Sequence, residues 1–300
     1  MINLNKNTKN VIVKIKTLPA YFFSALFLVV LITEGCQTKK VIYTPTGYII
    51  NEPETFELGT KLNEISGICW INDSLMLANN DESGKIFAIN LANMQDFEYR
   101  NVKFAAKDDY EDIVKVGSSI YVLISTGQII KISNYNSADS LQSEVVAQLE
   151  GKENEFESLY YDKEVNSLVM LCKNCHKEKD KIRSAYRFDL DSNVLIDTPY
   201  YQIDMNVIRK KLDDSRQEFR PSAAAVNPMD NKVYIVSSIG KLMVVINKKG
   251  KVEQAFGISG IDFPQPEGIT FADNGDMFIS NEVATEARAT LLKFKYKKPK

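Results

Sequence analysis

The sequence is poor in the residue types and motifs on which many enzymes depend. Its 300 residues include a single histidine, His176, which leaves little room for a catalytic Ser-His-Asp triad. It contains no Gly-x-Ser-x-Gly elbow, Walker loop, Gly-x-Gly-x-x-Gly or His-Glu-x-x-His motif. The 37 lysines and arginines are balanced by 39 acids, so the net charge is -2, with no basic stripe. Because phosphate backbones attract basic surfaces, we expect no nucleic-acid partner.

Hydrophobic runs long enough to cross a bilayer are missing as well. The apolar run near the N-terminus, Tyr21 to Ile32, has 12 residues, whereas a spanning helix needs about 20. It follows residues 1–17, which carry four lysines and no acid. A basic segment followed by a short apolar one is typical of an export signal. The sequence therefore predicts a signal peptide over residues 1–35.

Gly35 and Cys36 directly follow this segment and resemble the bacterial lipobox, in which the cysteine becomes the lipidated first residue of the mature chain. Thr33 and Glu34 depart from the usual leucine and small residue of that pattern. We predict lipidation of Cys36 and a polar tether over residues 36–54, which would anchor the protein in the bacterial cell envelope without crossing the membrane. An uncleaved signal anchor and a soluble secreted chain with a free thiol are the alternatives.

What the sequence does contain is an internal repeat. Five copies of a short phrase occur, and their second residues lie 45, 46, 65 and 45 positions apart. The copies are Ile65-Ser66-Gly67-Ile68, Tyr110-Glu111-Asp112-Ile113, Phe156-Glu157-Ser158-Leu159, Pro221-Ser222-Ala223-Ala224 and Pro266-Glu267-Gly268-Ile269. This spacing lies in the range of β-propeller blades.

Short apolar runs separated by turn residues follow each copy. The runs are rich in Val, Ile, Tyr and Phe, and Asn-Asp or Asp-Asn-Gly stands between them, which is typical of antiparallel strands. One such unit cannot bury its apolar faces alone, whereas a closed ring of units can. We therefore predict an all-β fold, with one propeller of five repeats over residues 55–300.

Two segments fall outside the regular repeat. Thr55 to Leu58 precedes the first copy, and we expect it to supply the outer strand of the last blade, which would close the ring. The long 65-residue step leaves roughly 20 extra residues, which lie in Lys173 to Arg183 or in Asp197 to Arg220. Within the second stretch, Met205 to Leu212 has the spacing of a short amphipathic helix.

Superposing the five copies places three glutamates, Glu111, Glu157 and Glu267, at one equivalent position. Equivalent residues of successive blades lie on a ring about the axis, so these carboxylates would converge near the central channel. Ionised carboxylates about 6 Å apart repel pairwise by roughly 3 kcal/mol at an effective dielectric near 20. Such a cluster must take up protons or hold a cation, and its hard oxygen ligands suit Ca²⁺. Alternatively, the glutamates cap strand ends or bond backbone amides of a neighbouring blade.

Further polar residues stand near this position. Two residues before it in each copy are Glu64, Asp109, Glu155, Arg220 and Gln265. Asn79 to Glu82 and Ser280 to Glu282 end predicted second strands, where they would add oxygen ligands, line a pocket or form turns.

The order Ser, Glu, Glu, Ser, Glu at this position resembles the SdiA-regulated family of bacterial envelope proteins over about residues 55–297. The resemblance implies a five-bladed β-propeller, distantly similar to NHL-repeat propellers, with a calcium site and no established activity. The acidic positions of the family correspond to Glu111, Glu157 and Glu267. The chain departs from the family at three positions where glycine is favoured: Asp112, Ser158 and Ala223.

The string Cys172-Lys173-Asn174-Cys175-His176 matches the attachment motif of c-type haem. Haem attachment normally lies on a helix and needs a distal ligand, whereas Cys172 ends an apolar strand. The sequence therefore favours a disulfide or a nearby thiol pair of Cys172 and Cys175, stiffening an exposed loop, over haem. A fortuitous pair is the other alternative. Cys69, beside Trp70 in an apolar run, is most simply a buried free thiol.

Two functions from different classes fit these residues. The first is a lipid-anchored binding platform whose propeller holds Ca²⁺ near the axis and recognises a protein or small-molecule ligand. The second is a metal-dependent hydrolase similar to lactonase or esterase propellers, in which the ion would activate a carbonyl or water. The sequence favours the platform over the enzyme, because no further catalytic group accompanies the carboxylates.

Overall fold

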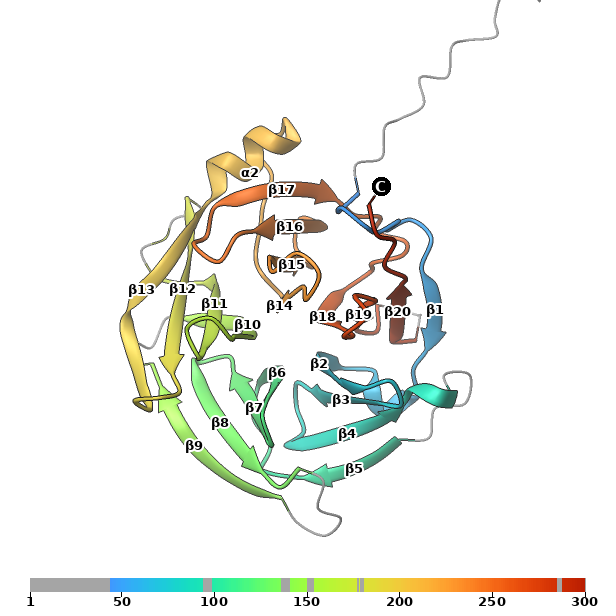
Figure 1. The fold of residues 1–300 in the computed structure, drawn as a ribbon, viewed down its shortest axis with the longest axis vertical. Helices are drawn as coiled ribbons and strands as arrows, with labels where there is room; N and C mark the ends of the chain where they lie inside the picture. Colours follow the sequence, from blue (N-terminus) through green and yellow to red (C-terminus); the bar gives the residue numbers. More distant parts are fainter. Residues whose placement is uncertain are drawn as a thin grey trace, which may run out of the picture. The chain divides into compact units, whose positions relative to one another are not determined.

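The computed structural model of the chain describes residues 44–93, 99–135, 141–149, 154–176, 178, 181–284 and 288–299. These residues form five sheets of four antiparallel strands each. Figure 1 shows the sheets set around a central axis as the blades of a propeller. The predicted five-bladed all-β fold is therefore confirmed. The predicted signal peptide, Cys36 and the first part of the tether lie outside the described residues.

In each blade the four strands lie at increasing distance from the axis (Figure 1). The innermost strands are β2 (Ile65–Asn72), β6 (Tyr110–Val116), β10 (Glu155–Asp162), β14 (Ala223–Val226) and β18 (Pro266–Phe271). The second strands are β3 (Leu75–Asn80), β7 (Ser119–Ile124), β11 (Ser167–Asn174), β15 (Val233–Ser237) and β19 (Met277–Asn281). The third strands are β4 (Lys85–Asn90), β8 (Gln128–Ser133), β12 (Ile182–Asp189), β16 (Leu242–Ile246) and β20 (Thr290–Phe294). The outermost strands are β5 (Tyr99–Lys103), β9 (Gln142–Gln148), β13 (Val194–Asp204), β17 (Val252–Gly257) and β1 (Glu54–Glu57).

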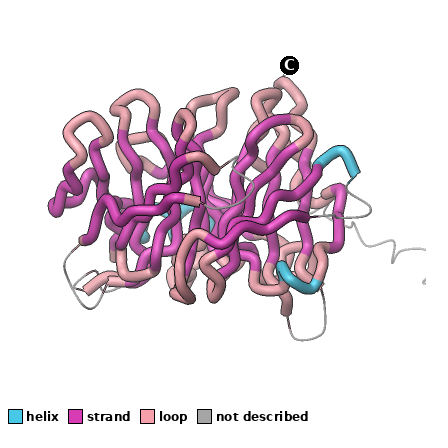
Figure 2. Tube along the Cα trace, turned by 90° about the horizontal axis from the view of Figure 1, so that it is seen from below, coloured by secondary structure: helices cyan, strands magenta, loops and turns pink. Residues whose placement is uncertain are grey.

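The strand sequences reflect their depth in the ring. In blade four every residue of β15 and β16 is buried, whereas the outer strand β17 is only partly buried. Middle strands are covered on both faces by neighbouring blades, so they read as continuous apolar runs. Figure 2 shows the strands of the ring from the side, between two layers of loops.

The ring closes through the N-terminal strand. β1 pairs antiparallel with β20, with Thr55 opposite Leu292, and so becomes the outer strand of the last blade. This pairing confirms the predicted closure and leaves the first and last repeats joined through backbone hydrogen bonds. Sharing one sheet between both ends of the chain prevents the ring from opening without breaking that sheet.

The extra residues of the long step form the eleven-residue strand β13 and the helix α2 (Met205–Leu212). The carboxylate of Asp204 caps the helix by accepting a hydrogen bond from the Asn206 amide at 2.8 Å. Met205 and Ile208 are buried, and Figure 1 shows the helix outside the ring beside β17. The predicted amphipathic helix is therefore confirmed. No helix in the part of the chain described here is long and apolar enough to span a membrane.

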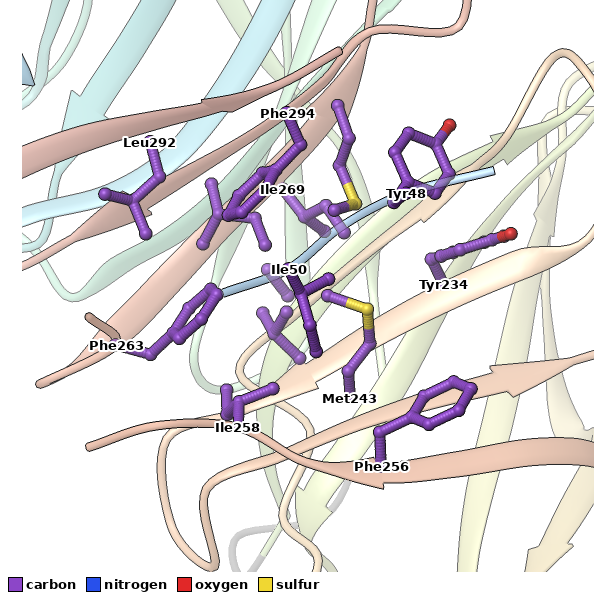
Figure 3. Packing of buried hydrophobic residues seen from close by; sticks show 14 of the residues in the cluster. Tyr48, Ile50, Tyr234, Met243, Phe256, Ile258, Phe263, Ile269, Leu292 and Phe294 are labelled. Atoms are coloured by element: carbon purple, nitrogen blue, oxygen red, sulfur yellow. The ribbon is translucent and has the colours of Figure 1, made fainter. Parts of the chain in front are cut away.

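The seam between blades four and five is covered by a segment that precedes β1, which we call the strap (residues 44–50). Figure 3 shows Tyr48 and Ile50 of the strap among side chains of both blades. The Tyr48 hydroxyl donates to the Gly275 carbonyl at 2.7 Å and accepts from the side-chain amide of Asn227 at 3.0 Å. The segment from residue 44 on thus packs against the propeller, although the sequence assigned it to the tether.

Candidate functional site

The three glutamates stand near the beginning of inner strands in blades two, three and five. Blades two and five are separated by blade one, yet Glu111 and Glu267 interact electrostatically. These two carboxylates are therefore close enough for the charge of one to act on the other. Glu157 is 7% exposed and shares the ammonium of Lys173 with them. We call the end of the channel formed by Glu111, Glu157, Glu267 and Lys173 the acidic mouth.

Lys173 comes from the end of β11 in blade three and supplies the positive charge of the acidic mouth. Its ammonium hydrogen-bonds the Glu157 carboxylate and lies 3.1 Å from the Glu155 carboxylate. It also stabilises the charged forms of Glu111 and Glu267. The lysine thus stands among three carboxylates that belong to different blades. In the described chain the three glutamates do not form a closed cage of oxygens within 4.8 Å of one another.

Glu111 is the least satisfied of the three carboxylates. The described residues give its carboxylate no hydrogen bond or ion pair. Burial raises its pKa to about 9, and the neighbouring charges of Asp109, Glu267 and Glu155 act in the same direction, while Lys173 opposes them. At neutral pH and without a further cation, this carboxyl group is therefore protonated.

Glu267 is held by more partners than Glu111. Burial raises its pKa, whereas Lys173, the hydroxyls of Ser222 and Ser238, and Lys241 favour its charged form. The Ser222 hydroxyl accepts from the Ser238 amide at 3.1 Å. Ser222 belongs to the fourth copy of the repeated phrase, so a serine of one blade supports a glutamate of the next.

A second group of acids lies beside the mouth. Burial raises the pKa of Glu282 to about 7, and the charges of Glu267, Asp81 and Glu64 add to this effect. Burial also raises the pKa of Asp81 to about 6, again with Glu64 nearby. The side chain of Gln265 hydrogen-bonds Glu282. The residues that end the second strands of blades one and five therefore belong to the same acidic region.

Asp112, next to Glu111 in the chain, has a different role. It is 2% exposed, and its carboxylate accepts hydrogen bonds from the Ile113 amide at 2.8 Å and the Leu159 amide at 2.7 Å. Leu159 belongs to blade three, so Asp112 joins two blades. The expectation that a carboxylate bonds a neighbouring blade's amide thus holds for Asp112, one residue after the glutamate position. At the equivalent position in blade one, a Cβ on Gly67 would lie 2.6 Å from the Asp112 carboxylate, which only glycine avoids.

Beyond this level, further along the inner strands, lies a cavity of about 280 Å³. It is lined by later residues of all five inner strands, among them Trp70, Lys115, Tyr161, Val226 and Phe271. Asp112 reaches its wall, but the three glutamates do not. The cavity and the acidic mouth are therefore separate parts of one axis, divided by the level at which Asp112 ties the blades.

The cysteines lie close to this region. Cys172 and Cys175 are joined by a disulfide with their Cα atoms 5.9 Å apart, and Lys173 lies inside the small loop that the bond closes. The His176 amide donates to Asn154 at 3.2 Å. Cys69 is free and buried, as predicted.

The sequence alone did not identify Lys173 or Glu178 as members of a site. Lys173 stands near the end of β11, which at eight residues is longer than the second strands of the other blades. The carboxylate of Glu178 lies with the sulfur atoms of Cys172 and Cys175 in a group whose atoms are all within 4.8 Å of one another. The only sequence signal for either was the charged stretch from Lys173 to Arg183.

Solved structures confirm the architecture at low identity. A glutaminyl cyclase from Myxococcus xanthus matches with a TM-score of 0.54 and 12% identity, covering 81% of this chain and 95% of that chain. A luciferin-regenerating enzyme matches with a TM-score of 0.52 and 10% identity, with the same coverage. A protein of unknown function from Bacteroides thetaiotaomicron matches with a TM-score of 0.51 and 12% identity, covering 82% of this chain and 72% of that chain. At these identities the likeness establishes the fold alone.

A search among curated proteins found no match. The profile of the SdiA-regulated family matches residues 54–285, which is most of the chain and includes all five copies of the repeated phrase. The chain belongs to the SdiA-regulated family.

Proposed function

We propose that this protein is a lipid-anchored binding propeller of the bacterial cell envelope that holds a Ca²⁺ ion at its acidic mouth. The observation that carries the proposal is the state of Glu111. Its carboxylate is desolvated, faces the like charge of Glu267 and has no ion pair within the described chain. A carboxylate in that position is favourable only when a proton or a cation neutralises it.

The charges of the acidic mouth suit a divalent cation. Three carboxylates and the ammonium of Lys173 sum to a net charge of -2 when all are ionised. Glu111, Glu157 and Glu267 would hold the ion, and Ca²⁺ accepts carboxylates together with water and carbonyl oxygens in flexible geometry. Bound there, the ion would supply positive charge between blades two, three and five. Lys173 would then move toward Glu155, whose side chain is 42% exposed.

The metal-dependent hydrolase is the second candidate. It would need the ion to keep an open coordination position inside a substrate pocket. The axial cavity of about 280 Å³ is large enough for a small organic molecule, which is the observation in favour of this candidate. None of the three glutamates lines that cavity, so an ion at the mouth would not reach a substrate held in it. This separation favours the binding platform.

Calcium titration by calorimetry tests the ion site. We expect the full chain to bind one Ca²⁺ with a rise in melting temperature, and the E111Q/E157Q/E267Q variant to lose both effects. The control variant E52Q/E144Q/E218Q changes the same number of charges at exposed positions and should bind normally. Equal binding by both variants would contradict the site.

A screen of lactones and esters with and without Ca²⁺ separates the candidates, because metal-dependent turnover would support the hydrolase.

The membrane anchor is tested separately. Intact-mass measurement of the membrane-extracted protein should show a chain that starts at Cys36 and carries a diacylglyceryl group. Without residues 1–35 the formal charge changes from -2 to -5, so an acidic propeller would be held near the membrane by lipid rather than by charge. A mass that corresponds to an unmodified Cys36 would overturn the anchor and leave the ion site untouched.

A further inference from the structure

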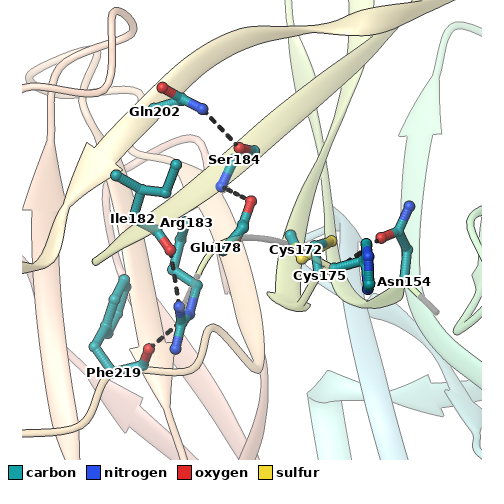
Figure 4. Close-up of a disulfide and its surroundings, with 10 residues drawn as sticks. Asn154, Cys172, Cys175, Glu178, Ile182, Arg183, Ser184, Gln202 and Phe219 are labelled. Atoms are coloured by element: carbon teal, nitrogen blue, oxygen red, sulfur yellow. Dashed lines mark hydrogen bonds between the residues drawn. A yellow bond between two sulfur atoms is a disulfide. The ribbon is translucent and has the colours of Figure 1, made fainter. Parts of the chain in front are cut away.

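Cys172, Cys175 and Glu178 form a compact group outside the acidic mouth. The two sulfurs and one carboxylate oxygen all lie within 4.8 Å of one another, and the three residues are 0%, 7% and 6% exposed. Figure 4 shows the Glu178 side chain between the Ser184 amide and the disulfide. The Glu178 amide donates to the Cys175 carbonyl at 3.2 Å, so a tight turn brings the carboxylate back to the sulfurs.

Only half of the Glu178 carboxylate is satisfied. Its Oε1 atom accepts a hydrogen bond from the Ser184 amide at 2.9 Å. Its Oε2 atom is buried and has no hydrogen-bond partner. A buried acceptor without a partner destabilises the folded state, and a disulfide has no donor to offer it. While the disulfide is formed, nothing in this group of three residues therefore explains why Oε2 of Glu178 is buried without a partner.

We infer that reduction of the Cys172–Cys175 disulfide creates a Zn²⁺ site formed by both cysteine sulfurs and the unpaired Oε2 of Glu178. Reduction by a dithiol transfers two electrons to the sulfur pair, breaks the S–S bond and leaves two thiols, while the reductant becomes a disulfide. Binding of Zn²⁺ then releases the two thiol protons to solvent and forms two thiolate bonds and one carboxylate bond.

The donor set selects the metal. Zn²⁺ takes thiolate and carboxylate ligands, and two cysteines separated by two residues are a frequent part of its sites. Ca²⁺ prefers oxygen ligands alone, so the group differs in chemistry from the acidic mouth. Three protein ligands leave a fourth position for solvent or another donor. The proposal is independent of the calcium site, since none of the three residues belongs to the mouth.

The site also has a consequence for the mouth. Lys173 lies inside the loop closed by the disulfide, and the same lysine holds Glu155 and Glu157. The oxidation state of the cysteines and the metal bound to them therefore influence how firmly the ammonium is held among the carboxylates.

Metal titration of the reduced full chain tests the site. After reduction with a phosphine and removal of the reagent without air, Co²⁺ should produce a thiolate charge-transfer absorbance, and one equivalent of Zn²⁺ should abolish it. The oxidised chain should bind neither metal here. The E178Q variant keeps the size of the side chain and an acceptor for Ser184, and we expect its Zn²⁺ affinity to fall at least about tenfold.

Two further variants make the result decisive. E144Q removes an exposed acid of blade two and should bind Zn²⁺ as the parent does, as should E111Q/E157Q/E267Q. Circular dichroism of each reduced protein checks that the propeller is intact. Unchanged Zn²⁺ affinity in E178Q would overturn the proposal, because binding would then come from the thiols alone. Failure of the reduced parent to bind Zn²⁺ would overturn it as well, whatever the calcium titration shows.

Discussion

The acidic mouth and the seam beneath the strap both join blades, but they do so by opposite physical means. At the seam, Tyr48 and Ile50 fill the gap between blades four and five with buried apolar surface, and the Tyr48 hydroxyl has both a donor and an acceptor partner. At the mouth, carboxylates from three blades are brought together with one ammonium, and Glu111 has no ion pair in the described chain. The Tyr48 hydroxyl at the seam is satisfied within the described chain, whereas the Glu111 carboxylate at the mouth is not.

This difference indicates which part of the ring serves stability and which part serves binding. Apolar burial stabilises a fold without any ligand. A cluster of desolvated like charges destabilises the fold until something neutralises it. Natural chains retain such clusters mainly where a ligand or reaction requires them. The comparison therefore indicates that the seam stabilises the ring without a ligand, and it is consistent with our proposal that a ligand binds at the mouth.

Removing the strap's aromatic ring should have the largest effect. In Y48A the ring and its contacts with Tyr234, Phe271 and Tyr296 are lost. We expect the free energy of unfolding to fall by about 3 to 5 kcal/mol, as for other buried aromatic residues replaced by alanine. Chemical denaturation measures this change. T46A, at an exposed position of the same segment, should cost less than about 0.5 kcal/mol.

If Y48A were as stable as the parent, the strap would add no stability to the ring, which would then be closed through β1 alone. Y48F separates the two contributions, since it keeps the ring and removes the hydroxyl. We expect Y48F to lose about 1 to 2 kcal/mol, because the Asn227 side chain and the Gly275 carbonyl lose a partner.

The tie between blades two and three should have the next largest effect. D112A leaves the amides of Ile113 and Leu159 buried without acceptors. Each unsatisfied group costs about 1 to 3 kcal/mol, but D112A also removes the cost of burying the Asp112 carboxylate. We therefore expect a net loss of about 2 to 4 kcal/mol in denaturation experiments. D112N keeps one acceptor oxygen and should lose about half as much. A D112A variant with parental stability would show that the inner strands are held together without this bridge.

Much of the architecture could be predicted because repetition makes a local pattern visible several times over. The phrase around Glu111 recurs in every blade, so its spacing defines one equivalent position in each repeat. The need to bury both faces of every sheet then predicts a closed ring, with an outer strand supplied by Thr55 to Leu58. The effect of the Glu267 charge on Glu111 is consistent with the same symmetry.

The features that sequence reasoning missed are those without a counterpart in other blades. Lys173 reaches the mouth from β11, which has eight residues and is longer than the second strand of any other blade. Tyr48 precedes the first repeat and looks like part of a linker until its hydroxyl is seen to bond blades four and five. Glu178 meets the sulfurs through a turn in the blade-three insertion. Single events of this kind have no periodicity from which they could be read.

The mouth should make the metal-free protein lose stability as pH rises. The folded-state pKa of Glu111 is raised from its ordinary value of 4.5 to about 9, and those of Glu282 and Asp81 are raised to about 7 and about 6. Between the ordinary pKa of each group and its raised folded-state pKa, the folded state binds more protons than the unfolded state. Stability from these groups is therefore fully present below about pH 4 and is lost as pH rises through the folded-state pKa values.

E111Q isolates the contribution of one carboxyl group to this pH dependence. The amide needs no proton, so we expect E111Q to be more stable than the parent by about 1 to 2 kcal/mol at alkaline pH in the absence of metal. The difference should shrink toward pH 4. Melting curves from pH 4 to 9 in a chelator measure it, with E144Q as the exposed control. A parent protein whose stability is independent of pH in this range would mean that Glu111 is not desolvated in solution.

The smallest effect that we predict is also the most specific, because it concerns a positive charge that would compete with the ion for Glu157. The ammonium of Lys173 binds Glu157 and Glu155, and K173Q removes that positive charge while keeping a polar side chain. We expect Ca²⁺ affinity at the mouth to rise about tenfold, equivalent to about 1.4 kcal/mol, because the ion no longer has to displace the lysine. K248Q, which removes a lysine bonded to Asp162 elsewhere in blades three and four, should leave Ca²⁺ affinity unchanged. Weaker binding in K173Q would mean that the ammonium positions Glu157 for the ion instead of competing with it, and the mouth would then resemble the seam in being organised by its own contacts.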